Sequence, residues 1–121
     1  MEQFKLGEME EQFAQLIWKH KPVSSRTLTE ICAGAFDWKR TTTYTMLRRL
    51  CDRGLFQNIN GTVTSLMSEA DFRAGQGEQF LNETFEGSLP QFLAAFTRRN
   101  KLSKKEIHEI QKLIDEHKEG L

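Results

Sequence analysis

The side chains best suited to binding lie on one side of a helix expected at residues 39–53. At about 100° of rotation per residue, Thr42, Thr45 and Arg49 fall within roughly 60° of one another. Hydroxyl groups bond to phosphates or base edges, and a guanidinium group grips phosphate or reads guanine. The other side is apolar and carries Thr43, Leu47, Leu50 and Cys51. This pattern predicts a DNA-reading helix; the alternative is an ordinary solvated basic surface.

The distribution of charge favours the same interpretation, although the formal net charge of the chain is zero. Between Trp18 and Gly54 the sequence has eight basic and three acidic residues, a net charge of +5. Acidic residues dominate elsewhere. Such polarity can orient a protein on DNA while keeping it soluble.

Several elements are needed to position the basic helix. Apolar residues at helical spacing predict a first helix over residues 7–19, which stops before Pro22. Ser24 or Ser25 caps a second helix, which is expected to end at Gly34. The basic helix is closed by Gly54, and two β-prone runs, 55–59 and 62–66, flank the Asn-Gly hairpin signal at residues 60–61. Three helices and a hairpin predict a winged helix-turn-helix domain over residues 1–67.

Residues 68–121 show only helical patterns, with predicted helix starts at Ser68, Ser88 and Ser103. These helices contain too few residues to enclose their apolar side chains in a core of their own. We therefore expect a helical dimerisation domain in which two copies pair, the alternative being that it folds back on its own winged helix. The predicted dimerisation residues are Phe80, Phe85, Leu89, Phe92, Leu93, Phe96, Ile107, Ile110 and Ile114. The predicted fold class is mainly α with a small β-hairpin.

The sequence offers no pattern for catalysis, a cofactor or a metal. Motifs for nucleophilic serine, zinc-protease and phosphate-loop chemistry are missing, so an enzyme is not expected. His108 and His117 lack metal-ligand spacing, and Cys32 and Cys51 lack a CxxC arrangement. With neither a leader nor an apolar run that could enter a membrane, the chain is expected to be cytoplasmic.

The order of these residues resembles the penicillinase repressor and methicillin-resistance regulator family. The residues that carry the resemblance are Leu16-Ile17-Trp18-Lys19, Val23-Ser24, Asp37-Trp38, the run from Thr41 to Leu50, and Arg53-Gly54-Leu55. It extends from about Leu6 to Asp115. The resemblance implies a dimeric winged-helix repressor that binds a palindromic double-stranded DNA operator, with β-lactam-response genes among those that the family controls.

The resemblance also implies individual contacts with the operator. Thr42, Thr45 and Arg49 would touch DNA, with Thr41 and Arg48 beside them. Tyr44 stands where relatives often have a basic residue that contacts a base. The hairpin carries no cation, and Lys39 and Arg40 are expected to compensate by approaching phosphate near the helix start.

Two features leave the signal and the partner open. The resemblance implies an inducing protease, but Ala95-Phe96 stands where the β-lactam repressors have the cleaved Asn-Phe bond. The cation-free hairpin and zero net charge also suit a winged-helix adaptor that binds protein and not DNA.

Overall fold

The computed structural model describes residues 2–121, which form two compact units. The first, here called the winged-helix unit, runs to Gln79, and the second, the tail unit, runs from Phe80 to Leu121. Each is described by itself. The mainly α fold with a small β-hairpin, predicted from the sequence, is confirmed.

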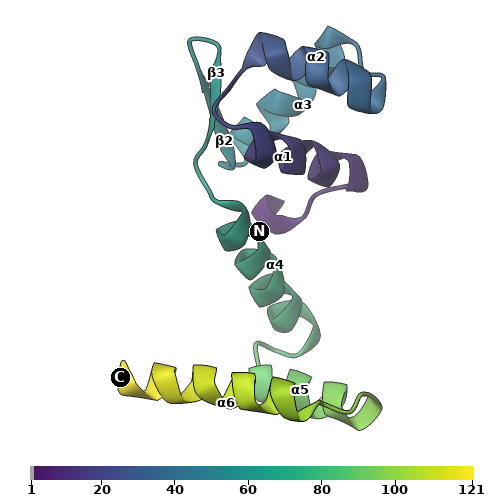
Figure 1. Cartoon of the computed structure of the whole chain (residues 1–121). Coiled ribbons are helices and arrows are strands. Elements are labelled where there is room, and N and C mark those ends of the chain that lie inside the picture. The colour runs from purple at the N-terminus through teal and green to yellow at the C-terminus, as the bar shows by residue number, and fades with distance from the viewer. Residues whose placement is uncertain (1) are drawn as a thin grey trace. The chain divides into compact units, whose positions relative to one another are not determined.

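The winged-helix unit contains the helices α1 (Glu8–His20), α2 (Ser25–Phe36) and α3 (Arg40–Asp52), preceded by a 3-10 turn at Glu2–Phe4 (Figure 1). Their apolar faces meet in one core, because apolar residues recur every three or four positions along each helix. Fully buried members from the helices include Phe13, Ile17, Leu28, Cys32 and Leu50. Ser24 starts α2 as predicted, its Oγ accepting the Thr27 N–H at 2.9 Å.

The expected end of α2 at Gly34 is wrong. The helix continues to Phe36, and Asp37 closes it in the left-handed conformation with φ 56°. Aspartate tolerates this region better than most residues. The extra turn is held by aromatic packing, because Trp38 lies against Phe36 and Phe13 with ring centroids 4.8 and 5.3 Å away.

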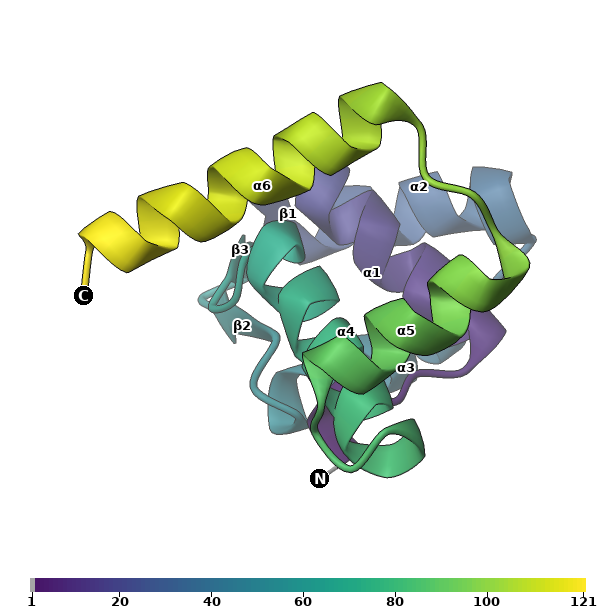
Figure 2. The ribbon, with the colours of Figure 1, turned by 90° about the horizontal axis from the view of Figure 1, so that it is seen from below.

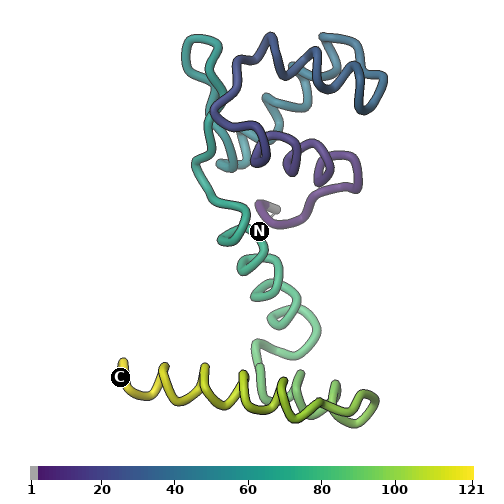
Figure 3. Tube along the Cα trace, in the orientation of Figure 1, coloured from purple at the N-terminus to yellow at the C-terminus, as the bar shows by residue number. Residues whose placement is uncertain are grey.

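The wing is part of a small antiparallel sheet in the order β1-β3-β2. The strands β2 (Phe56–Ile59) and β3 (Thr62–Ser65) form the predicted hairpin, whose tip can be followed in Figure 3. Asn60 and Gly61 both have positive φ, 52° and 83°, as the turn that favours Asn-Gly requires. A short third strand, β1 (Val23–Ser24), pairs with β3 in addition to the predicted hairpin.

The helix α4 (Glu69–Thr84) starts on the winged-helix unit. Phe72, in its first turn, is fully buried, and its ring centroid lies 5.4 Å from that of Trp18. The Trp18 indole N–H donates to the Met67 carbonyl at 2.9 Å, which anchors the chain just before α4. The division into a DNA-binding domain over residues 1–67 and a dimerisation domain over residues 68–121 stays a prediction. By packing, the winged-helix unit extends to Gln79.

The tail unit continues with α5 (Leu89–Arg99) and α6 (Lys104–Glu119), which runs back roughly opposite to α5 (Figure 2). Ser88 caps α5, and Ser103 with Glu106 forms the predicted capping box of α6. Phe85 and Phe92 contact each other with ring centroids 5.5 Å apart, and Phe80 and Phe96 extend this cluster. Neither α5 nor α6, both wholly within the described chain, contains a buried residue.

Candidate nucleic-acid interface

The two sides of α3 differ in burial. Thr43, Leu47 and Leu50 are buried against the core, and Cys51 is half-buried. The residues predicted to contact DNA are all exposed: Lys39, Arg40, Thr41, Thr42, Tyr44, Thr45, Arg48 and Arg49. The structure thus brings the predicted contact residues together on and just before one helix, where they are accessible to a ligand.

The buried side of α3 is fixed against α2. The side chain of Thr43, 1% exposed, lies beside the fully buried thiol of Cys32. Burial raises the pKa of the Cys32 thiol, and the neighbouring Thr43 hydroxyl offsets part of this increase. After the helix, Gly54 adopts φ 82° and Leu55 donates its N–H to the Leu50 carbonyl at 3.1 Å. These contacts fix the rotation of α3 and therefore which side chains face outward.

Ser25 connects α3, α2 and the wing. Its N–H donates to the Gly61 carbonyl at the tip of the hairpin at 2.7 Å, and its Oγ accepts the Tyr44 hydroxyl at 3.4 Å. The hydrogen bond with Ser25, and next the guanidinium of Arg40, lower the pKa of the Tyr44 phenol. The sequence identified Ser24 or Ser25 only as a helix cap. It gave no signal that Ser25 joins three elements.

A groove of about 640 Å³ runs between α3 and β2. Its lining combines hydroxyl, guanidinium, amide and apolar groups from Thr41, Tyr44, Thr45, Leu47, Arg48, Cys51 and Asn58. Asn58 comes from the wing and was not among the predicted site residues. Burial, and next the negative charge of Asp52, raise the pKa of the Cys51 thiol, so the thiol is kept in its neutral form.

The arginines of α3 have different surroundings from Arg53, its capping residue. The guanidinium of Arg49 donates to the Sδ of Met46 at 3.7 Å, a weak acceptor that a stronger ligand can replace. Arg53 instead donates to the Lys5 carbonyl and lies 3.9 Å from the Glu10 carboxylate. Arg53 is therefore engaged within the protein.

The predicted dimerisation residues remain partly or largely exposed in the single chain. Phe96 is 40%, Phe80 and Ile114 are each 48%, and Leu89 and Ile107 are each 52% exposed. Half-buried positions are Phe85, Phe92, Leu93 and Ile110. Such a concentration of exposed apolar surface is unusual for a monomer.

Across residues 2–121, no group of three or more His, Cys, Asp and Glu side chains could hold a metal ion. Within the same range, no helix combines the length and hydropathy needed to cross a membrane.

Comparison with known proteins gives matches over nearly the whole chain. Residues 6–116 match the model of a family described as penicillinase repressor. The chain is 28% identical to the penicillinase repressor of Bacillus licheniformis, over 94% of this chain and 92% of that protein. It is 22% identical to the methicillin resistance regulatory protein MecI of Mammaliicoccus sciuri, over 93% and 94%. The chain therefore belongs to the penicillinase repressor family, whose members are transcriptional repressors and not enzymes.

Proposed function

We propose that this protein is a homodimeric repressor that binds a palindromic DNA operator through helix 39–53. Two copies of α3 would enter successive major grooves, about one helical turn apart, and each would read one half-site. Occupancy of the operator would block the promoter. The single observation that carries this proposal is the exposed face of α3, where hydroxyl and cationic side chains gather while the opposite face is buried.

The groove beside α3 supports this mode of binding. With α3 in a major groove, a neighbouring DNA strand would pass between the helix and the wing. Arg48 and Thr41 offer donors to its phosphates from one wall, and Asn58 offers an amide from the other. Lys39 and Arg40 add positive charge just before and at the first turn of α3, where the helix dipole also favours phosphate.

The homodimer is supported by the exposed apolar residues of the tail unit. Burial of apolar surface contributes about 25 cal/mol per Å² removed from water. Side chains such as Ile107 and Leu89, about half-exposed in the single chain, would gain this stabilisation against a second copy. Twofold pairing is the commonest arrangement of oligomers, and it matches the symmetry of a palindromic operator.

The regulated genes and the inducing partner form a further part of the proposal. The names of the two relatives favour control of genes of the β-lactam response. An inducing protease would have to reach α5, where Phe96 is 40% exposed and Ala95 is half-buried. A repressor must be in the compartment that holds its promoter. The proposal therefore includes the cytoplasmic location expected from the sequence.

A protein-binding adaptor is the second candidate, favoured by the uncharged wing. Its polar side chains carry no positive charge that could bind phosphate; they are Gln57, Asn58, Asn60, Thr62 and Thr64. The two candidates differ in their response to salt. A repressor releases counterions when it binds DNA, so its affinity falls as log[salt] rises, whereas an adaptor has little affinity for DNA at any salt.

The experiment is selection of duplexes from a random-sequence pool, followed by titration of the selected duplex at several salt concentrations. We expect an inverted repeat and a linear decrease of log affinity with log[salt]. Arg49→Ala should weaken binding by about 1–3 kcal/mol if Arg49 contacts a guanine. Arg98→Ala, which removes the same charge from the exposed end of α5, is the matched control and should bind as the wild type does.

Two results would contradict the proposal. Failure of the pool to yield an inverted repeat at low salt would favour the adaptor. Equal affinity of Arg49→Ala and wild type for the selected duplex would remove Arg49 from the interface.

A further inference from the structure

The segment before α1 makes contacts that lie outside the helices and wing of the winged helix. None of them involves a residue predicted to contact DNA. Residues 3–5, here called the N-terminal clasp, lie beside both the end of α3 and the first turns of α4. Figure 3 shows the chain passing between α1 and the start of α4 before it enters α1. All these contacts fall within the winged-helix unit.

Phe4 and Gly75 form the apolar part of these contacts. The Phe4 ring lies 5.7 Å from that of Phe72, centroid to centroid, and it packs directly on the α4 backbone at Gly75. A Cβ atom at position 75 would overlap the ring of Phe4. Glycine in a helix interior costs about 1 kcal/mol relative to alanine, and here it allows this close approach.

Polar contacts extend the clasp on both sides. Gln76 of α4 donates its side-chain amide to the Phe4 carbonyl at 3.4 Å. At the other side, Gln3 donates to the Arg53 carbonyl at 3.2 Å, and the Arg53 guanidinium donates to the Lys5 carbonyl. The clasp therefore connects the residue that caps α3 with the third turn of α4.

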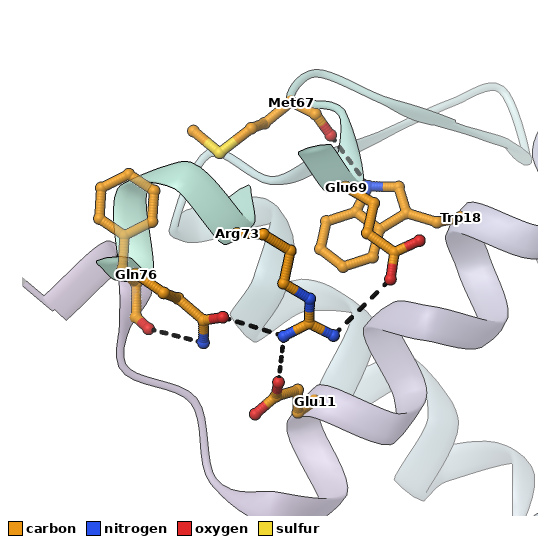
Figure 4. A network of polar contacts seen from close by, with 7 residues as sticks. Glu11, Trp18, Met67, Glu69, Arg73 and Gln76 are labelled. Carbon is orange, nitrogen blue, oxygen red and sulfur yellow. Dashed lines mark hydrogen bonds and ion pairs between the residues drawn. The ribbon is translucent and has the colours of Figure 1, made fainter. Parts of the chain in front are cut away.

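A second connection joins α4 to α1 through Arg73 (Figure 4). Its guanidinium pairs with the Glu11 carboxylate of α1, donates to the Gln76 side chain at 2.9 Å and lies 3.6 Å from the Glu69 carboxylate. The side chains of Arg73 and Glu11 are 39% and 31% exposed, so water screens this pair partly. Together with the clasp, it fixes α4 at several points along its first two to three turns.

We propose that the N-terminal clasp fixes the direction in which α4 leaves the winged helix and thereby sets the half-site spacing that the dimer accepts. This inference rests on the proposed function, because spacing matters only to a dimer that reads two half-sites. α4 is one continuous helix from Glu69 to Thr84 and leads into the predicted dimerisation residues. A change in its starting direction would therefore change how the two copies of α3 can be placed on DNA. Phe4 and Gly75 are positioning residues that need not touch DNA.

The test uses the full chain and the inverted repeat selected by the wild type. One base pair inserted at its centre turns one half-site by about 34° relative to the other. We expect this insertion to weaken wild-type binding by about tenfold and binding of Phe4→Ala by less than about threefold, because a loosened α4 adapts to both spacings. Affinity for a duplex with a single half-site should be the same for both proteins.

Two glycine variants separate the clasp from the helix that it contacts. Gly75→Ala should displace the Phe4 ring and relax the spacing preference as Phe4→Ala does, even though alanine is the better helix former. Gly77→Ala lies in the same helix with no atom within 4 Å of the added Cβ, and it is the matched control. It should retain the wild-type spacing preference.

Hydrogen exchange provides a measurement without DNA. Backbone amides of residues 72–79 should exchange faster in Phe4→Ala and Gly75→Ala than in the wild type, with exchange in α2 and α3 unchanged. Sedimentation should show that both variants remain dimers.

Three outcomes of these experiments would contradict the inference, each for a different reason. If the wild type discriminates between spacings and both clasp variants discriminate equally, the clasp does not set the spacing. If the wild type itself tolerates the insertion, the direction of α4 is irrelevant and the inference is wrong. If no inverted repeat is selected at all, the proposed function fails and this inference fails with it.

Discussion

The winged-helix unit and the tail unit differ in how they bury their apolar side chains. The buried apolar core lies entirely in the winged-helix unit, from Phe13 to Phe72. In the tail unit, α5 and α6 bury no residue, and Leu113 is 66% exposed. Because burial of apolar surface is the main favourable contribution to folding, the first unit is stabilised within one chain, and the proposed dimer would cover the apolar side chains of the second. Under the proposed function, folding therefore depends on the first unit and association on the second.

Removal of most of the tail unit gives the largest expected effect. A chain ending at Gly87 lacks α5 and α6, and we expect it to sediment as a monomer at concentrations where the full chain is a dimer. It should still unfold cooperatively in urea, because the core is retained. A fragment that remained dimeric would show that the dimer interface lies outside α5 and α6. It would contradict the difference proposed between the two units.

Two phenylalanine substitutions test whether the two units differ in what their apolar side chains stabilise. Phe72→Ala removes a fully buried ring and should lower the free energy of unfolding by about 3–5 kcal/mol, measured by urea denaturation. Phe96→Ala removes the same atoms from a ring that is 40% exposed. It should leave the unfolding of the winged-helix unit unchanged and weaken dimerisation. Equal losses of stability in both variants would mean that the units do not differ as described.

The smallest expected effect concerns a polar contact inside the winged-helix unit. Tyr44→Phe removes the hydroxyl that donates to Ser25 and should lower the free energy of unfolding by less than about 1 kcal/mol, because the bond is long and partly exposed. Affinity for the selected duplex should change more than stability does if the hydroxyl also contacts DNA. A larger loss of stability would show that Ser25 and Tyr44 contribute to the core.

Local patterns made much of the fold predictable. The Asn-Gly pair at 60–61, the caps at Ser24, Ser88 and Ser103, and the closing Gly54 each act within a few residues, so their effect can be read from adjacent positions. The buried side of α3 followed from helical periodicity. The predicted DNA-contact residues share an exposed face, and their contacts with DNA stay a prediction.

The remaining features depend on partners distant in sequence. The last turn of α2 is held by the Trp38 ring, which itself packs on Phe13 of α1, and periodicity within α2 cannot reveal that contact. β1 has only two residues and exists because β3 pairs with it. The packing of Phe4 on Gly75 could not be predicted. A short turn has no periodic pattern, and a glycine in a helix does not indicate which residue packs on it.

The packing of Phe4 on Gly75 has a consequence for protein engineering. The two positions share a single volume, so a larger residue at one must be matched by a smaller residue at the other. A library that varies them separately would discard combinations in which each change compensates the other. Varying them as a pair would change the geometry of α4 without altering any side chain predicted to contact DNA.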